Sequence, residues 1–332
     1  MPILQPTPEN LQRAAQLLRD GELVALPTET VYGLGANALD TGAVQKIFSL
    51  KERPSYNPLI IHVLDEQHAR ELVTVWPQRA QLLAEAFWPG ALTLVLPKRD
   101  IVPELVTAGL PNVALRAPSH PVARQLLKIA QLPLAAPSAN KFTQTSPTRA
   151  QHVQQSLGDE LFVLDGGACD LGIESTVLDL SGEVPILLRP GSVSRAQIET
   201  VLRENIDIEY SNDDSETPRR APGQMRKHYA PRAKLLIYRS ISERHVLVQN
   251  SVAHDFMIGI IAIDDELEMQ RIVRLPNNAL QYASQFYNAL HELDAQGCDV
   301  ILVEALPQNS EWDGVRDRLG RAASTEQNPE YE

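Results

Sequence analysis

Cysteine is almost absent from this 332-residue chain, which contains only Cys169 and Cys298, far apart in the sequence. Two isolated thiols provide neither the ligand set of a structural zinc site nor the framework of a disulfide-rich domain. No paired-cysteine or His-x-x-x-His spacing indicates zinc either. We therefore expect Cys169 to be an inert small residue, and a reducing cytoplasm as the compartment.

Positive charge and long apolar runs are also scarce. The chain has 30 Lys and Arg against 42 Asp and Glu, a formal net charge of −12. This balance disfavours a broad nucleic-acid surface but leaves room for a local basic cleft. The longest apolar run, Met257–Ile263, is far shorter than the roughly 20 residues of a membrane span. The N-terminus has no basic and apolar signal-peptide regions, so we expect a cytoplasmic protein with no membrane contact.

The hydrophobic pattern predicts an α/β fold in the first part of the chain. Apolar segments predict strands at residues 23–26, 59–63, 91–97, 113–116, 161–165, 175–180 and 185–189. A first helix should begin after Thr7 and end before Gly21. Further helices are predicted at residues 42–50, 121–130, 148–156 and 195–203. Because some strands follow one another directly, we expect a mixed sheet.

A polar stretch at residues 211–220 predicts a linker between two domains. Beyond it, KLLIY, FMIGIIAI and DVILVEAL predict strands, and residues 278–294 and 315–323 predict helices. We therefore expect a first domain at 1–205, a linker at 206–233 and a small Rossmann-like α/β domain at 234–332. We interpret GVRDRLGRAAS as a packing helix rather than a docking helix.

The segment PTETVYGLG, residues 27–35, follows the strand ELVAL. Its glycines would let the backbone approach a ligand, although an ordinary strand-to-helix turn explains the segment equally well. No Gly-Lys-Ser/Thr follows, which excludes a Walker loop.

Cationic residues mark several other segments. Lys51 and Arg53 follow a helix and would suit a polyphosphate, although a solvated helix end is the commoner explanation. Arg116 ends an apolar strand, where a carboxylate clamp and a structural salt bridge are equally plausible. Arg189 ends another strand. His62, inside an apolar strand, is by itself best explained as a core residue.

Hydroxyl and amide side chains crowd into LAAPSANKFTQTSPT, which contains Ser138, Asn140, Ser146 and a candidate helix N-cap, Thr148. Such a density at a strand end slightly favours a binding site. There is no Gly-x-Ser-x-Gly and no base fixed beside a serine, which argues against a hydrolase triad. Cations and hydroxyls without a nucleophile suit phosphoryl chemistry. The residues alone therefore predict a phosphorylated or carboxylate ligand, such as a nucleotide.

Several segments, taken in order, resemble the YrdC-like family of threonylcarbamoyl-AMP synthases. They are PTETVYGLG, KERP, NPLIIHV, FWPGALTLVL, VALRAPSHP, APSAN, SPT, IESTVLDL and LLRPGSVS, and they span residues 27–194. APGQMRKHYAP and the second domain resemble the family's long form. The resemblance implies a twisted mixed sheet with helices around a concave cavity. It also implies a nucleotidyltransferase that condenses L-threonine, bicarbonate and ATP to threonylcarbamoyl-AMP and pyrophosphate for tRNA modification.

The resemblance assigns roles to individual residues. It implies that Thr30, His62 and Ser175 contact L-threonine and that Arg116 holds its carboxylate. It implies that ATP is bound by Lys51, Arg53, Asn57, Ser138, Asn140, Ser146, Arg189 and Tyr229, the last from a linker that covers the cavity. Lys51 and Arg53 would be catalytic. Mg²⁺ should be bound mainly through the ATP phosphates, without a protein metal site. The contacts of Gln224, Met225 and Arg226, where the family often has Met-Lys-Tyr, stay open.

Partners follow from the same resemblance. Downstream tRNA-modification proteins would receive the product, and a weak contact with tRNA would accompany that transfer. Two other functions compete with this one. A non-catalytic RNA-binding module is disfavoured by the acidic charge. Carbamoyl transfer in hydrogenase maturation occurs in an architecture with zinc-binding cysteine pairs, which this chain lacks.

Overall fold

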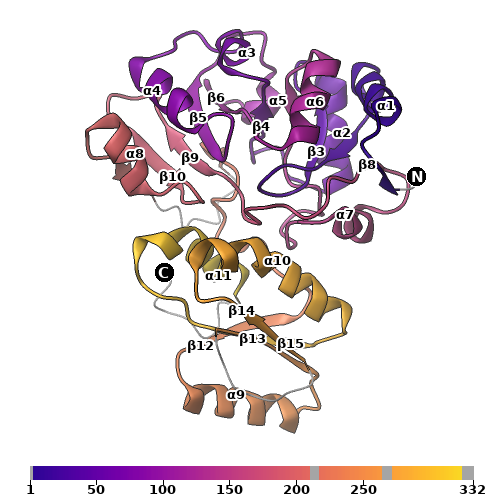
Figure 1. Ribbon diagram of the computed structural model, residues 1–332, viewed down its shortest axis with the longest axis vertical. Coiled ribbons are helices and arrows are strands. Elements are labelled where there is room, and N and C mark those ends of the chain that lie inside the picture. Colours follow the sequence, from indigo (N-terminus) through magenta and orange to yellow (C-terminus); the bar gives the residue numbers. More distant parts are fainter. Residues whose placement is uncertain (1–2, 210–216, 264–270, 324–332) are drawn as a thin grey trace.

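The computed structural model describes residues 3–209, 217–263 and 271–323. We call residues 3–208 the N-terminal unit, residues 217–233 the linker, and the described residues from 234 onward the C-terminal unit; the two units are stacked in Figure 1. The described part of the N-terminal unit contains an 11-stranded sheet. From one edge to the other its strands are β1 (Ile3–Leu4), β8 (Phe162–Leu164), β2 (Val24–Leu26), β3 (Gly33–Asn37), β7 (Leu134–Ala135), β4 (Ile60–His62), β6 (Asn112–Arg116), β5 (Leu92–Pro97), β9 (Thr176–Asp179), β10 (Ile186–Arg189) and β11 (Asp207–Ile208).

The sheet is mixed, which confirms the prediction. β4 pairs with β6 and β5 pairs with β9 in parallel, whereas β5 and β6 are antiparallel. We expected Gly33 and Gly35 of PTETVYGLG to lie in a loop after the strand. This expectation was wrong, because both glycines lie in β3, which pairs with β2 in antiparallel. Glycine disfavours strands in general. Here a Cβ on Gly35 would lie 2.8 Å from Leu26 Cδ2, so close strand packing explains the glycine.

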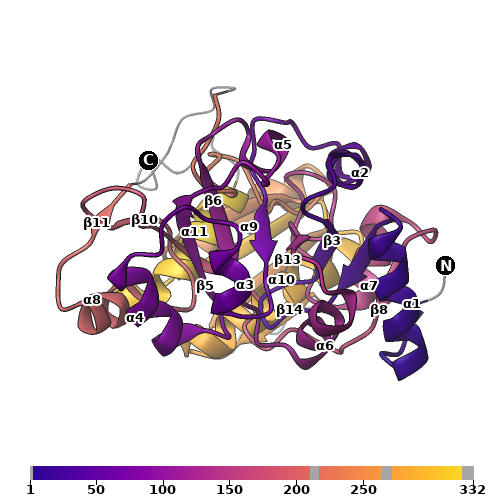
Figure 2. The ribbon, with the colours of Figure 1, turned by 90° about the horizontal axis from the view of Figure 1, so that it is seen from above.

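Helices cover the N-terminal sheet. They are α1 (Pro8–Arg19), α2 (Thr41–Lys51), α3 (Glu66–Arg70), α4 (Gln78–Phe87), α5 (Glu104–Thr107), α6 (Pro121–Ala130), α7 (Ala150–Leu157) and α8 (Arg195–Leu202). Figure 2 shows α4 and α8 near one end of the sheet and α1 and α6 near the other. As predicted, Thr7 caps α1, with its Oγ1 accepting a hydrogen bond from the backbone N–H of Asn10 at 3.2 Å.

The predicted N-cap of α7, Thr148, is wrong. The N-cap position is Arg149, which makes no side-chain capping bond, and Thr148 Oγ1 is buried without a partner in the described structure. The imidazole of His152 accepts a hydrogen bond from the backbone N–H of Thr148 instead, at 3.3 Å. A ring inside the helix thus bonds the loop that precedes it, and no side chain caps the first turn of α7.

The main core fills the space between the centre of this sheet and its helices. Leu34, Ile61, Leu94 and Leu115, from β3, β4, β5 and β6, are fully buried and belong to one cluster with Ile47 of α2. Each such side chain contributes roughly 1.5–3 kcal/mol through removal of apolar surface from water. This packing fixes the strand ends, from which the site residues emerge.

The C-terminal unit has a parallel sheet of four described strands. In spatial order they are β12 (Lys234–Tyr238), β15 (Val300–Glu304), β13 (Ile258–Ile263) and β14 (Ile272–Leu275). Leu247 of α9 (Ile241–Ala253) packs on one face, and α10 (Ala279–Ala295) and α11 (Asp313–Ala322) pack on the other. A short 3₁₀ turn, η1 (Ser310–Trp312), precedes α11. The unit is therefore α/β, as predicted.

Helices α10 and α11 lie between their own sheet and the N-terminal unit (Figure 1). The contact is close enough to exclude side chains at two glycines. A Cβ on Gly172 would lie 2.5 Å from the carbonyl oxygen of Ala283 in α10, and a Cβ on Gly314 would lie 3.1 Å from Gly191 Cα. The two units thus meet backbone to backbone. Within the described residues, no helix has the length and apolar character needed to cross a membrane.

Candidate active site

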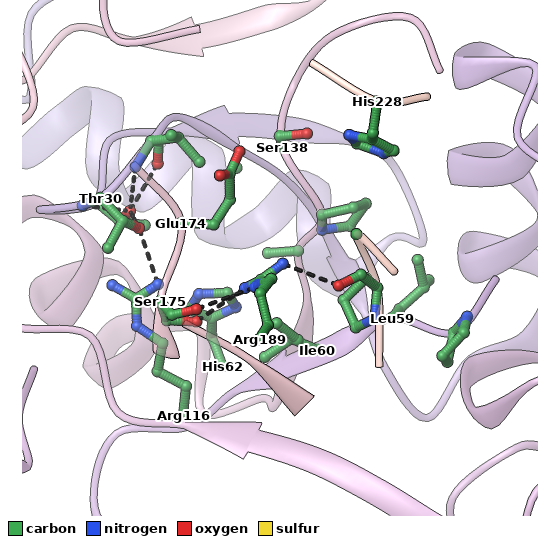
Figure 3. Close-up of a pocket in the computed structure, with 18 of the residues that line it drawn as sticks. Thr30, Leu59, Ile60, His62, Arg116, Ser138, Glu174, Ser175, Arg189 and His228 are labelled. Carbon is green, nitrogen blue, oxygen red and sulfur yellow. Dashed lines mark hydrogen bonds between the residues drawn. The ribbon is translucent and has the colours of Figure 1, made fainter. Parts of the chain in front are cut away.

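A pocket lies where the strand ends of the N-terminal unit meet the linker (Figure 3). In this view Thr30 and Arg116 are at one end, His228 is at the other, and Arg189 lies between them. The walls are formed by Thr28, Thr30, Val31, Gly33, Arg53, Pro58, Leu59, Ile60, His62, Arg116, Ala136, Pro137, Ser138, Glu174, Ser175, Arg189, Pro222, Gly223, His228 and Tyr229.

Arg116 organises the first end of the pocket. Its Nη1 donates to Thr30 Oγ1 at 2.8 Å, and its Nη2 forms a 2.7 Å ion pair with the buried carboxylate of Glu29. Burial raises the pKa of Glu29, but the charge and hydrogen bonds of Arg116 outweigh it and hold this pKa below its usual value. Arg116 therefore forms the structural salt bridge that was one of the two sequence interpretations, and it also lines the pocket.

His62 lies opposite Arg116 in the parallel pairing of β4 and β6. It lines the pocket and is buried, and its Nδ1 has no hydrogen-bond partner among the described atoms. Burial, followed by the charge of Arg116, lowers the pKa of His62 to about 3. The ring is therefore neutral at physiological pH and faces the pocket, rather than being a fully satisfied core residue.

Arg189 links the middle of the pocket to the linker. It donates to the Ser175 carbonyl at 3.0 Å, to Ser175 Oγ at 3.2 Å and to the Pro222 carbonyl at 3.0 Å. Ser175 Oγ is also 2.7 Å from Thr93 Oγ1. A buried guanidinium and a pair of hydroxyls are thus fixed together, as suits an anionic ligand.

Lys51 and Arg53 differ in position. Arg53 lines the pocket, and its guanidinium donates to Asn57 Oδ1 at 2.7 Å and to the Pro58 carbonyl at 2.8 Å. Lys51 lies behind the wall and donates to the Ser138 carbonyl at 2.6 Å. Burial and then Arg53 lower the pKa of Lys51 well below its usual value. The structure therefore places Lys51 as support for the loop that carries Ser138.

The other predicted residues that do not line the pocket stand directly behind its walls. Asn57 bonds Arg53, and Ser146 Oγ donates to the pocket residue Glu174 at 2.5 Å. Asn140 accepts from Lys51 through its carbonyl at 2.5 Å. These three residues thus hold the wall in place.

The linker supplies the remaining wall. Tyr229 is buried in the pocket, with its ring centroid 5.9 Å from that of Tyr287 in α10. Gly223 has φ +82°, and a Cβ there would lie 2.2 Å from the Tyr229 hydroxyl. Glycine is therefore required at this position for the tyrosine to occupy the pocket.

The neighbouring linker residues bind both units. Gln224 Nε2 donates to the Leu188 carbonyl at 3.4 Å, and the carbonyl of Met225 accepts from Arg321 in α11 at 2.6 Å. Arg226 is exposed. These are the positions at which the sequence left the contacts open.

Two acidic residues of the site were missed by sequence reasoning: Glu174, which lines the pocket, and Glu29, which stands behind the wall against Arg116. Both lie within the quoted motifs PTETVYGLG and IESTVLDL. A search for groups that bind anions passes over carboxylates. Each carboxylate has an arginine that compensates its charge: Glu29 pairs with Arg116, and Glu174 pairs with Arg318. This compensation makes them compatible with an anionic ligand.

A resident metal does not fit these residues. The pocket carboxylate of Glu174 and the nearby carboxylate of Glu29 are both paired with arginines, and no cluster of three His, Cys, Asp or Glu suited to a metal occurs in the described part of the chain. The other polar side chains that line the pocket are arginines, hydroxyls and two imidazoles. They are suited to bind an anion.

Comparisons with known proteins agree with this geometry. Residues 16–191 match the Sua5–YciO–YrdC family model, described as "Telomere recombination", and residues 193–324 match "Threonylcarbamoyl-AMP synthase, C-terminal domain". The chain is 39% identical to the threonylcarbamoyl-AMP synthase of Pyrococcus abyssi over 93% of both chains. It is 40% identical to that of Bacillus subtilis over 94% of this chain and 92% of the relative.

A solved structure, that of P. abyssi Sua5 complexed with L-threonine, matches with a TM-score of 0.89 at 38% identity, covering 94% of each chain. A match of this extent covers most of both units. The chain therefore belongs to the Sua5–YciO–YrdC family, in its long form with the threonylcarbamoyl-AMP synthase C-terminal domain.

Proposed function

We propose that this protein is a threonylcarbamoyl-AMP synthase, which condenses L-threonine, bicarbonate and ATP and releases pyrophosphate. The single observation that carries the proposal is the pocket itself. It joins a guanidinium–hydroxyl pair, Arg116 and Thr30, to a second cationic region formed by Arg53 and Arg189. One end suits a small amino acid, and the other suits a polyphosphate.

L-Threonine would bind at the Arg116 end. Arg116 would bind the substrate carboxylate, with Thr30, Ser175 and the neutral ring of His62 around the amine and hydroxyl. The name of the P. abyssi complex supports this, since that relative binds L-threonine. Neutral His62 can accept a hydrogen bond without adding charge.

ATP would bind at the Arg53 and Arg189 end, beneath the linker. Arg53 and Arg189 would contact its phosphates, with Ser138 and Tyr229 in the surrounding wall. Asn57, Asn140 and Ser146 would hold that wall in place. Lys51 has two N–H donors committed to backbone carbonyls, which leaves one for a ligand. Lys51 and Arg53 are thus our proposed catalytic residues.

The reaction is a nucleotidyl transfer. The threonine amine captures CO₂ or bicarbonate to give a carbamate, one oxygen of which attacks the α-phosphorus of ATP as pyrophosphate leaves. The chain would bring the two anions together and neutralise their charge, so that proximity supplies much of the rate. The buried linker residues would exclude water from the labile product. Mg²⁺ would reach the pocket on the ATP phosphates, where it neutralises charge.

The product would serve tRNA-modification proteins in the cytoplasm, with at most a weak contact between this acidic chain and tRNA itself. The proposal is tested by incubating the purified protein with labelled bicarbonate, L-threonine and ATP. The expected result is labelled threonylcarbamoyl-AMP and one pyrophosphate per product, with neither formed when L-threonine is omitted. Tight tRNA binding without ATP turnover would overturn the proposal in favour of an RNA-binding module.

A further inference from the structure

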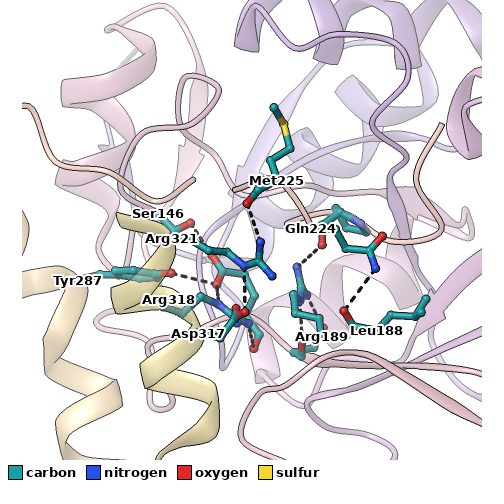
Figure 4. A network of polar contacts seen from close by, with 12 residues as sticks. Ser146, Leu188, Arg189, Gln224, Met225, Tyr287, Asp317, Arg318 and Arg321 are labelled. Carbon is teal, nitrogen blue, oxygen red and sulfur yellow. Dashed lines mark hydrogen bonds and ion pairs between the residues drawn. The ribbon is translucent and has the colours of Figure 1, made fainter. Parts of the chain in front are cut away.

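The C-terminal unit contacts the pocket wall at Glu174, chiefly through Arg318 of α11 (Figure 4). Arg318 is fully buried, and its Nε lies 2.7 Å from Glu174 Oε2. Its Nη2 also donates to the Glu174 backbone carbonyl at 3.2 Å. The Tyr287 hydroxyl, from α10, donates to the same carboxylate oxygen at 3.1 Å. One pocket carboxylate is thus held by two helices of the other unit.

The opposite side of Glu174 faces the pocket. Its Oε1 accepts a hydrogen bond from Ser146 Oγ at 2.5 Å, and the residue that follows, Ser175, is bonded to Arg189. Burial raises the pKa of Glu174, but the charges of Arg318 and Arg189 outweigh it, so the pKa is below its usual value. Glu174 is therefore ionised in the wall that we assign to the nucleotide.

An ionised carboxylate beside a polyphosphate site needs a partner of its own. Without Arg318, Glu174 would keep a buried and uncompensated charge, which is strongly unfavourable. Arg189 is the other guanidinium whose charge lowers the pKa of Glu174. Loss of Arg318 would therefore draw Arg189 toward Glu174, or leave a negative charge facing the phosphates.

The same helix holds the linker. Asp317 pairs with both Arg318, at 2.5 Å, and Arg321, at 2.9 Å. Arg321 donates to the Met225 carbonyl, and its own carbonyl accepts from the backbone N–H of His228 at 3.0 Å. The position of α11 is thus tied to both the Glu174 wall and the linker wall of the pocket.

We propose that Arg318 is a positioning residue for nucleotide binding. By compensating and orienting Glu174 from the C-terminal unit, it keeps the Ser146–Glu174 bond in place behind the wall and leaves Arg189 facing the phosphates. The inference rests on the proposed function, since it takes ATP as the ligand of that wall. It assigns the C-terminal unit a defined part in the chemistry of the N-terminal unit.

The test is a double-mutant cycle in the full-length protein, with Arg318→Met, Glu174→Gln and the double variant. ATP and L-threonine affinities are measured by calorimetry, alongside thermal unfolding. We expect Arg318→Met to weaken ATP binding by roughly tenfold or more, and L-threonine binding much less. The double variant should recover a substantial part of the ATP affinity, because Gln carries no charge to compensate. Arg318→Lys should fall between Arg318→Met and the unchanged protein.

Arg316→Met is the matched control, because Arg316 lies on the same helix but bonds Pro307, Asn309 and Asp313 within its own unit. Should Arg318→Met fail to fold, Arg318→Lys and the double variant carry the comparison. Unchanged ATP affinity, or equal losses for both ligands without recovery in the double variant, would overturn the inference. Failure of the unsubstituted protein to make product would instead count against the proposed function. In that case, non-additive changes in the free energy of unfolding across the cycle would still show that Arg318 and Glu174 are coupled.

Discussion

Arg116 and Glu29 form a 2.7 Å ion pair in which both side chains are almost completely buried at the edge of the pocket. Arg116 also bonds Thr30 and the Gly90 carbonyl, so its planar guanidinium serves several acceptors at once. A buried charge pair is costly to break from one side, because the other charge is left uncompensated. This pairing keeps Arg116 oriented before any substrate carboxylate arrives.

Arg116→Lys is expected to raise the KM for L-threonine by about tenfold or more, because an ammonium cannot reproduce the planar fork. The KM for ATP should change much less. Steady-state kinetics with each substrate varied in turn make the comparison. The exposed pair of Arg70 with Glu66 supplies the control, Arg70→Lys. Equal effects on both KM values would contradict a specific contact with threonine.

Arg53→Ala is expected to abolish pyrophosphate release. The substitution removes a pocket cation and also frees the 57–58 turn that Arg53 holds. A coupled pyrophosphate assay measures the loss. Lys46→Ala, which removes a partly exposed cation paired with Glu22, should leave the rate unchanged. Near-normal turnover by the Arg53 variant would refute its catalytic role.

Gly223→Ala is expected to displace Tyr229 from the pocket and to lower activity, because the new methyl group would overlap the tyrosine hydroxyl. Gly109→Ala is the matched control. Gly109 has a similar φ of +77°, but nothing lies within 4 Å of the added carbon. Both variants carry a backbone strain of roughly 1–2 kcal/mol, and only Gly223→Ala adds the overlap with Tyr229. Activity separates them, and equal activities would argue against a role for Tyr229.

Acid should destabilise the protein through its buried histidines. His152 of α7 stacks on His291 of α10 at 3.9 Å, and burial lowers the pKa of both, that of His152 to about 3. Below pH 6.5 the unfolded chain binds protons that the folded chain does not. The free energy of unfolding therefore falls as the pH drops from 6.5 toward 3, by up to about 1.4 kcal/mol per unit for each such histidine.

Denaturant unfolding at several pH values measures this slope. His152→Gln should make it shallower, whereas His245→Gln, at an exposed position, should not. An unchanged slope in the His152 variant would show that this stack is not responsible for the loss of stability in acid.

Much of the N-terminal sheet was predictable, because β4, β5 and β6 are continuous apolar runs ending at recognisable turns. Helix α6 has the predicted bounds. Helices α4 and α9 were not predicted, for physical reasons that can be named. The N-cap of α4 is Pro77, which makes no capping bond, and α9 exposes Ile241 and Val252, which blurs its apolar face.

The pocket residues were found from motif order, and the structure brings them together around one cavity or directly behind its walls. Arg318 could not be found in this way. The charged residues of GVRDRLGRAAS have the pattern of a solvent-exposed helix face, yet the Arg318 side chain is fully buried against Glu174. Such a contact depends on how the two units pack, and no local spacing encodes that.

The Arg318–Glu174 contact also has a consequence for synthesis on the ribosome. The two residues are 144 positions apart, so at 5–20 residues per second Glu174 emerges on the order of ten seconds before its partner. Throughout that interval the nascent N-terminal unit carries an acid whose counter-charge has not yet been made. Assembly of a working enzyme thus waits for α11, which is translated late, and a chain stalled before α11 would be a natural target for chaperones and proteases.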